Sequence, residues 1–330
     1  MKKLLCSILA AGILTTSFIG CGNSKSKSDE DYVLKLAVAG SLCEAPIQMA
    51  VENGYFEEEG VKIEKVKIES AQAADSLQSH STDALMGLIS KMAQPLENGL
   101  EAKLVLGVHT GCTKILVAKD SDIKTPKDLK GKSIGVPGMA SAPAILTQRV
   151  LAHEGIGVTT SNLEVDFQVF NQNDLPLALE NGSVQAIAIS DPAGAIAVNS
   201  GTARVLYDSA TDDFTKDEYC CGFFLSNDLV EKHPDIAAKV TRAIEKGCKF
   251  VNENKEETAK IQVDKQWVAG EADVNAEILK TYNYNPSVDG GKEALHNNLK
   301  DLQEVKLLKD DTDVDALTEN TFVKLEGIES

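Results

Sequence analysis

Two adjacent cysteines, Cys220 and Cys221, lie in the stretch "EYCCGFFLS" (residues 218–226), which otherwise has the composition of a β-strand. The sequence contains seven cysteines, and two of them fall within its first 21 residues. The spacing of the others matches no disulfide-rich scaffold, and a chain of 330 residues can bury a core without disulfides. These other thiols are Cys43, Cys112, Cys220, Cys221 and Cys248.

Three roles are open for these thiols. Free cysteine is often simply a small buried residue, and we expect this of Cys248, which falls in a long amphipathic segment. Thiolates also bind soft metals such as zinc, copper(I) or iron, and the candidates are Cys43, Cys112 and Cys221. His109 would add an imidazole to such a site. A disulfide such as Cys43–Cys112 is the third role. Apolar filling is the leading interpretation, so we expect no bound metal or cofactor.

The adjacent pair carries a geometric restriction. In a regular strand, neighbouring side chains point to opposite faces, so we expect only one of Cys220 and Cys221 to face a ligand. A disulfide between neighbours would close a strained ring and is disfavoured. One thiol is therefore predicted to meet a ligand and the other to point away.

Small and polar residues follow predicted strands, which is where α/β proteins bind ligands. "GSLCE" (residues 40–44) and "GMASA" (residues 138–142) each separate a strand from a helix. Their backbone N–H groups suit an anion or a carbonyl group, although Ser41 and Ser141 equally suit helix capping. The candidate ligand-binding residues in these loops are Ser41, Leu42, Cys43, Glu44, Gly138, Met139 and Ser141.

Further candidates lie at other strand ends. Met86 and Gly87 end a buried strand, and Gly87 allows close approach of the backbone to a ligand. Asp191 follows the strand "AIAIS", and its carboxylate suits either an amine or the capping of the next helix. His109 suits an anion or a metal, although a single histidine is more often structural. Cys112, Cys220 and Cys221 complete the candidate set.

The elements that position these residues alternate between strand and helix. Strands are predicted at 33–38, 61–68, 82–87, 102–108, 114–119, 133–136 and 184–190. Helices are predicted at 45–56, 142–155 and 234–254. This alternation favours a parallel α/β sheet, and a second series of strand–helix units begins near residue 120. We therefore expect two α/β lobes, with a helical C-terminal part that returns to the first.

The N-terminal segment is typical of export. Lys2 and Lys3 precede an uncharged stretch, residues 4–19, that is shorter than the about 20 residues of a membrane span. We predict a signal peptide at 1–20. "FIGCG" resembles a bacterial lipobox, which implies a lipid such as palmitate on Cys21, although Phe18 stands where leucine is usual. The polar residues 21–32 are predicted to form a flexible tether.

The formal net charge of −17 limits the kinds of molecule that the protein can bind through its surface. A strongly acidic surface repels nucleic acid and anionic lipid, and the sequence contains no basic patch to offset it. We expect no nucleic-acid partner, and contact with the membrane only through lipid on Cys21.

Three longer stretches carry a resemblance. They are "LAVAGSLCEAPIQMAVENGYFEEEGVKIE" (36–64), "DIKTPKDLKGKSIGV" (122–136) and "ALENGSVQAIAISDP" (178–192). Together they resemble the nitrate/sulfonate/taurine and thiamine-pyrimidine-precursor family of ABC transporter substrate-binding lipoproteins. The chain departs from the family pattern at Ser190, where an aromatic residue is frequent.

The resemblance implies a type II periplasmic-binding-protein fold, with two α/β lobes joined by two crossings. Lobe one would comprise residues 33–117 and 223–330, and lobe two residues 118–222. It also implies that the chain is no enzyme. As a monomer, it would capture a small molecule of the nitrate, sulfonate, bicarbonate or pyrimidine-precursor kind. It would then deliver this ligand to ABC permease and ATPase subunits at the extracytoplasmic face of the membrane.

Two alternatives remain. The eukaryotic thiamine-pyrimidine synthase shares this fold and holds iron with a Cys-Cys-Cys-Phe-Cys stretch, which "CCGFF" (220–224) matches only in part. Gly222 and Phe224 stand where the synthase has cysteines. The other alternative is a metal- or thiol-binding surface lipoprotein with no role in uptake.

Overall fold

The computed structural model describes residues 31–69, 72–328 and 330. The predicted signal peptide, Cys21 and nearly all of the tether lie outside these residues. Met1–Asp31 and Tyr32–Ser330 are separate units, and the fold below is that of Tyr32–Ser330. In the part of the chain that is described, no helix has the length and apolar character needed to cross a membrane.

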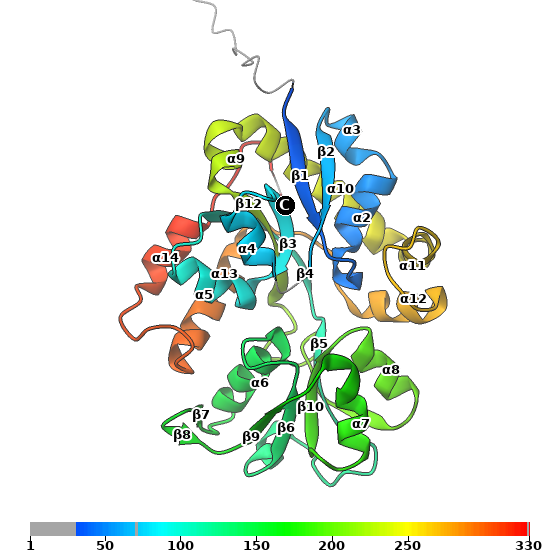
Figure 1. Ribbon diagram of the computed structural model, residues 1–330, viewed down its shortest axis with the longest axis vertical. Coiled ribbons are helices and arrows are strands. Elements are labelled where there is room, and N and C mark those ends of the chain that lie inside the picture. Colours follow the sequence, from blue (N-terminus) through cyan, green and yellow to red (C-terminus); the bar gives the residue numbers. More distant parts are fainter. Residues whose placement is uncertain (1–30, 70–71, 329) are drawn as a thin grey trace, which may run out of the picture. The chain divides into compact units, whose positions relative to one another are not determined.

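The first sheet combines strands from both ends of this unit (Figure 1). In sheet order its strands are β2 (Lys62–Lys67), β1 (Val33–Val38), β3 (Ala84–Leu88), β12 (Tyr219–Ser226) and β4 (Ala102–Thr110). β1 is parallel to β2 and β3, whereas β12 is antiparallel to both of its neighbours. Both faces are buried, because Phe223 packs in one core and the next residue, Phe224, in another.

Helices from the N-terminal and C-terminal parts cover the first sheet. The N-terminal ones are η1 (Leu42–Glu44), α2 (Ala45–Glu52), α3 (Tyr55–Glu58), α4 (Ala73–Gln78) and α5 (Ile89–Glu97). The C-terminal ones are α9 (Asn227–Lys232), α10 (Pro234–Glu253), α11 (Lys255–Asp264), α12 (Ala272–Thr281), α13 (Val288–Glu304) and α14 (Val314–Thr321). The amphipathic α10 packs on α2, and α13 packs on α5 and β4. The predicted return of the C-terminal helices to the first sheet is therefore observed.

The second sheet is built from one continuous segment. In sheet order its strands are β11 (Ala203–Asp208), β5 (Thr113–Ala118), β10 (Ala186–Ser190), β6 (Ser133–Val136) and β9 (Asp166–Val169). Its helical segments are η3 (Pro126–Leu129), α6 (Ala142–His153), η4 (Gln172–Asp174), α7 (Leu175–Glu180) and α8 (Ala193–Asn199). β7 (Val158–Thr159) and β8 (Asn162–Leu163) form a separate hairpin.

Two expectations about the sheets need correction. Both sheets are mixed rather than parallel, because β12 and β5 run antiparallel to their neighbours. Each of these strands begins where the chain passes from one sheet to the other. No helical crossover precedes them, and such a crossover is what makes successive strands parallel. β5 was predicted to belong to lobe one, but its ladders with β10 and β11 assign it to the second sheet.

The two crossings between the sheets lie against each other. The first crossing is Gly111–Cys112, between β4 and β5, and the second is the segment 209–218, between β11 and β12. Gly111 has φ +67°, and a Cβ at this position would collide with Ala210 of the second crossing. A glycine is therefore required where the two crossings meet.

Candidate ligand-binding site

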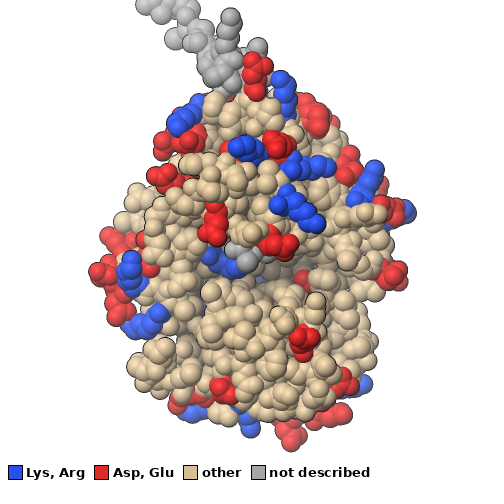
Figure 2. Space-filling view, in the orientation of Figure 1, with Lys and Arg blue, Asp and Glu red and all other residues tan. Residues whose placement is uncertain are grey.

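A cavity of about 640 Å³ opens between the two lobes, lined by residues of the first sheet and its helices and, from the other lobe, by the 138–141 loop and Ile145 of α6. Figure 2 shows the hollow at mid-height on a face where acidic and basic side chains are scattered over the surroundings. The carboxyl ends of β1, β3 and β6 lead into its walls, as expected for an α/β protein. The predicted site residues that line it are Ser41, Cys43, Glu44, Met86, Gly87, Gly138, Met139, Ser141 and Cys221.

The other predicted site residues lie elsewhere. Leu42 is fully buried in the core of the first sheet. His109, Cys112 and Asp191 are also buried and do not line the cavity. Cys220 lines a smaller, separate pocket beside the second crossing.

Sequence reasoning missed one wall of the cavity. The residues of this wall are Ile68, Ala73, Ala74, Asp75, Leu88, Ser90, Lys91, Met92, Gln94 and Pro95. They belong to α4, to α5 and to the segments that lead into them. α5 begins directly after β3, so its first turn faces the same opening as the end of that strand. The sequence does hold a signal for this wall: no loop separates "LMG" from the following helix, so the start of the helix must lie beside the end of the strand.

The first loop uses its own backbone donors. The carboxylate of Glu44 accepts hydrogen bonds from the N–H groups of Ala39 (3.0 Å) and Ser41 (3.2 Å), and the Ser41 hydroxyl accepts one from Cys43 N (3.3 Å). Burial raises the pKa of Glu44 to about 7, against the lowering effect of these hydrogen bonds. The N–H groups of Ala39 and Ser41 are therefore taken by Glu44 and are not free for an anion, while the predicted ligand contact of Ser41 stays a prediction.

The second loop, residues 138–142, also forms hydrogen bonds within itself and with the start of α6. The Ser141 hydroxyl donates to the carbonyl of Gly138 (2.6 Å) and accepts from Ala144 N (3.4 Å). Ser141 is thus the N-cap of α6, which was one of its two predicted roles. Met139 beside it is 43% exposed and lines the cavity.

The thiols form one cluster beneath the cavity. The sulfur of Cys112 lies 3.3 Å from that of Cys220, and the thiols of Cys112, Cys220 and Cys221 all lie within 4.8 Å of one another. Cys43 forms a second such group with His109 and Cys221. All five cysteines of the described residues are free thiols, and Cys248 is buried apart from the cluster in α10. The third role, a disulfide such as Cys43–Cys112, is therefore not observed among these cysteines.

The prediction for the adjacent pair is half right. Cys221 lines the large cavity and Cys220 does not, but both thiols reach the same cluster. The reason is an irregularity in β12, whose register against β4 shifts between Tyr219 and Cys221 and again between Cys221 and Gly222. A bulge bends the strand and breaks the strict alternation of faces.

The hydrogen bonds within the cluster shift the pKa values of Cys220 and Cys221 in opposite directions. Burial raises the pKa of Cys220, but hydrogen bonds from Cys112 and Cys221 outweigh it and lower the pKa to about 6. The pKa of Cys221 rises well above its usual value, because its hydrogen bonds to Cys112, Cys220 and Cys43, together with burial, favour the protonated thiol. Among the four thiols of the cluster, Cys220 is the one whose pKa is lowered.

His109 is enclosed by rings and sulfur. Its imidazole is fully buried, stacks on Tyr282 with ring centroids 5.4 Å apart, and lies 5.1 Å from Tyr284. Nδ1 lies 3.4 Å from the sulfur of Cys220, while Nε2 is buried without a hydrogen-bond partner among the described residues. The two tyrosines come from the segment after α12, which bridges to β4. Sequence reasoning did not find them.

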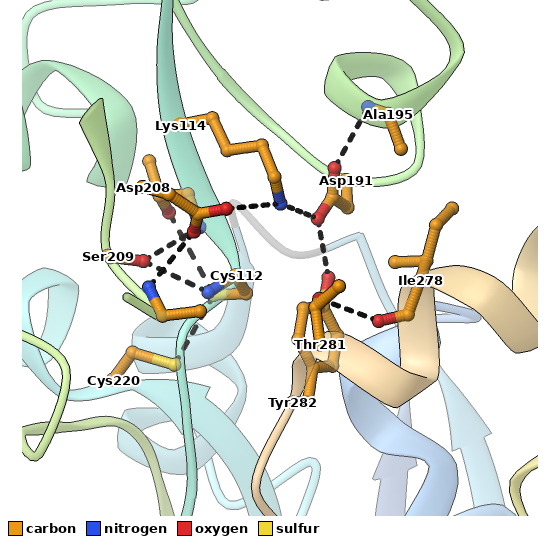
Figure 3. A network of polar contacts seen from close by, with 12 residues as sticks. Cys112, Lys114, Asp191, Ala195, Asp208, Ser209, Cys220, Ile278, Thr281 and Tyr282 are labelled. Atoms are coloured by element: carbon orange, nitrogen blue, oxygen red, sulfur yellow. Dashed lines mark hydrogen bonds and ion pairs between the residues drawn. The ribbon is translucent and has the colours of Figure 1, made fainter. Parts of the chain in front are cut away.

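Asp191 belongs to a buried network that joins the two lobes (Figure 3). Its Oδ2 accepts from Lys114 Nζ (2.6 Å) and from the Tyr282 hydroxyl (3.1 Å), and its Oδ1 accepts from Ala195 N (3.0 Å). Lys114 also lies 3.7 Å from Asp208. Asp191 therefore caps α8, as one interpretation predicted, and the amine that it binds is that of Lys114.

A second buried network also spans the lobes. Arg149 of α6 forms a bidentate pair with Glu218 (2.8 Å for each bond) and reaches Asp301 of α13 (2.7 Å to Nη2). Asn298 accepts from the same guanidinium. Nearby carboxylates raise the pKa of Arg149 although burial lowers it, so the side chain stays charged.

A family model described as "NMT1/THI5 like" matches residues 44–258 of the chain. The chain belongs to this family. The resemblance predicted from the sequence is thereby confirmed. A search among curated proteins finds no match to the chain.

Solved structures of low sequence identity share the fold of this family member. The aliphatic sulphonate binding protein SsuA of Escherichia coli is 19% identical with a TM-score of 0.75, over 90% of this chain and 94% of SsuA. The nitrate-binding protein NrtA of Synechocystis PCC 6803 is 16% identical with a TM-score of 0.73, over 88% and 86%. A zinc-bound import component of Staphylococcus aureus is 18% identical with a TM-score of 0.67, over 88% and 98%. The predicted periplasmic-binding-protein fold with two α/β lobes is confirmed.

Proposed function

We propose that the chain is the extracytoplasmic substrate-binding component of an ABC importer. The observation that carries this proposal is the cavity of about 640 Å³, which takes its lining from both lobes. A ligand held there contacts both lobes at once, so binding favours their closure around it. The family match and the periplasmic binding proteins of the same fold support the assignment.

The cavity favours an uncharged organic ligand over a small anion. Its volume lies in the range of cavities that hold drug-sized molecules and far exceeds that of nitrate. The charged residues among its described lining are Glu44, Asp75 and Lys91, and the loop donors that would bind an anion are occupied by Glu44. Of the ligand classes expected from the family, an uncharged heterocycle of the pyrimidine-precursor kind fits better than nitrate, bicarbonate or a sulfonate.

Closure requires movement at the two crossings. We take Gly111–Cys112 and residues 209–218 as the hinge, with lobe two formed by the segment between them. The closed, ligand-bound form would then be recognised by the permease and its ATPase. No catalytic step is assigned to the chain, and conversion of a ligand by the purified protein alone would contradict the proposal.

We further propose that a lipid on Cys21 anchors the monomeric protein at the extracytoplasmic face of the membrane, with residues 22–31 as a tether. The support is the sequence pattern around Cys21. Replacement by Cys21→Ala should release the protein from the membrane fraction of cells. Equal membrane association of both forms would exclude lipidation at this residue.

Thermal unfolding of the purified protein with a panel of compounds tests ligand binding. A true ligand at 100 times its Kd stabilises the native state by about 2.7 kcal/mol. We expect a shift with pyrimidine-type compounds and none with nitrate or bicarbonate. The substitution Met139→Lys, which introduces a charge into the lining, should weaken binding at least about tenfold.

The matched control is Leu177→Lys. Leu177 is 57% exposed and lies outside the cavity, so this substitution adds the same charge without touching the site. Equal loss of binding in both variants would show that the ligand does not bind in this cavity.

A further inference from the structure

The thiol cluster draws its donors from three separate segments. Cys43 lies in η1 after β1, and His109 and Cys112 lie at the end of β4 and in the first crossing. Cys220 and Cys221 lie at the bulge of β12. The structure groups these atoms into two sets, Cys43–His109–Cys221 and Cys112–Cys220–Cys221, each within 4.8 Å.

This spacing suits a metal ion. A Zn–S bond measures about 2.3 Å, so sulfurs bound to one tetrahedral ion lie about 3.8 Å apart. The sulfurs of Cys112 and Cys220 lie 3.3 Å apart, and the donor atoms of each group lie within 4.8 Å of one another, which is compatible with this spacing. Cys221 belongs to both groups and is their common member.

Ordinary core packing does not explain the cluster. Cys248 of α10 belongs to the same apolar core, and no other thiol or imidazole of the described residues is grouped with it. The cluster instead contains a fully buried imidazole whose Nε2 has no partner among the described residues. Buried polar atoms are nearly always satisfied in native proteins, so an unpartnered one at this place points to a missing ligand.

The donors select the class of ion. Thiolate and imidazole prefer soft or borderline cations, and hard cations such as calcium and magnesium require oxygen. The carboxylates of Glu44 and Asp191 are committed elsewhere, Glu44 to the N–H groups of its own loop and Asp191 to Lys114 and Tyr282. The oxygens that contact the cluster within the described residues include the Thr113 hydroxyl and the carbonyls of His109 and Thr110, all of them uncharged.

We propose that this cluster binds one thiophilic cation, zinc(II) or copper(I), at the floor of the cavity, with Cys221 as one ligand and the others drawn from Cys43, His109, Cys112 and Cys220. Cys43 and Cys221 line the cavity, which gives the ion a route of entry. The ion would join the first loop of lobe one to the first crossing and to the start of β12. The site stands whether or not the chain serves an importer.

Metal content of the full chain tests the site. The protein would be purified under anaerobic, reducing conditions, loaded separately with zinc(II) and copper(I), desalted and analysed by mass spectrometry of the elements. We expect about one ion per chain for at least one of the two metals, retained against a chromophoric chelator. Retention of neither metal by the wild-type chain would overturn the proposal.

Two variants localise the ion. Cys221→Ser removes the thiol that both groups share and should reduce retention at least about tenfold. Cys248→Ser changes a buried thiol outside the cluster and should retain the ion as the wild type does. Equal retention by the two variants, or equal loss, would contradict this location.

A spectroscopic measurement on the wild-type chain covers the case in which Cys221→Ser does not fold. Cobalt(II) bound by thiolates shows intense sulfur-to-metal charge-transfer bands in the near ultraviolet. We expect these bands on titration with cobalt(II), and their disappearance on addition of zinc(II). Cobalt bound without such bands would place the ion on other ligands and reject the site.

Discussion

At the residue scale, Asp191 is a buried carboxylate with three hydrogen-bond partners. Its two carboxylate oxygens serve a lysine and a tyrosine of two different segments and a backbone amide of α8. The aspartate and Lys114 have almost no exposed side-chain area, so their attraction is weakly screened. Removal of the negative charge leaves a buried ammonium with only Asp208, at 3.7 Å, as a partner.

We predict that Asp191→Asn lowers the free energy of unfolding by about 3 kcal/mol, because one half of a buried ion pair is removed. Denaturant unfolding monitored by circular dichroism measures the change. The control is Asp213→Asn, which removes the partner of Lys216 at a side chain that is 94% exposed, and it should change stability by less than about 1 kcal/mol. Similar values for both variants would show that the Asp191 network contributes little.

At the element scale, the decisive contact is the close approach of β4 to α13. Gly107 of the strand and Gly291 of the helix face each other without side chains between them. A Cβ on Gly107 would lie 2.7 Å from the ring of Tyr219 and 2.9 Å from Gly291 Cα. The helix is therefore held against the strand at a distance that only glycine permits.

Gly107→Ala should consequently destabilise the protein by about 1–3 kcal/mol, as overpacking of a tight contact does. Gly138→Ala is the matched control, because a Cβ there meets nothing within 4 Å. Thermal unfolding of the ligand-free protein compares them. A loss of stability in the control as large as that in Gly107→Ala would refute the packing argument.

Most of the strands and helices could be predicted from the sequence, but features that depend on long-range contacts could not. Strands such as 33–38 and 184–190 were found because their apolar runs are long and bounded. The direction of β12 and the sheet of β5 depend on which strands the crossings place side by side, and no local pattern encodes that. The candidate loops were located correctly, but whether Glu44 or a ligand takes their donors is decided by side-chain geometry. The bulge at Cys220 and the arrival of Tyr282 beside His109 left no periodic signal.

At the scale of the whole domain, two buried polar networks connect the lobes. The network of Lys114, Asp191 and Tyr282 lies on one side of the thiol cluster, and that of Arg149, Glu218 and Asp301 joins α6 to α13. Each network makes contacts that exist only while the lobes keep this arrangement. Their energies therefore contribute to the balance between open and closed forms.

We predict that Arg149→Met shifts the ligand-free protein toward a more open form, because the substitution removes a bond between the lobes. Small-angle X-ray scattering should report a larger radius of gyration. Arg242→Met is the control, since Arg242 pairs with Glu59 inside lobe one. An unchanged radius in Arg149→Met, or an equal increase in the control, would contradict the assignment of this network to the lobe arrangement.

The position of β12 in the first sheet also has a consequence for biosynthesis. β3 and β4 do not pair with each other, because β12 lies between them. A ribosome must therefore complete about two thirds of the chain before this sheet can close, whereas all strands of the second sheet lie between residues 113 and 208. Lobe two can thus fold first during synthesis, whereas β3 and β4 cannot pair into their sheet until β12 has been made. A chaperone that holds the chain unfolded would therefore act chiefly on β1, β2, β3 and β4.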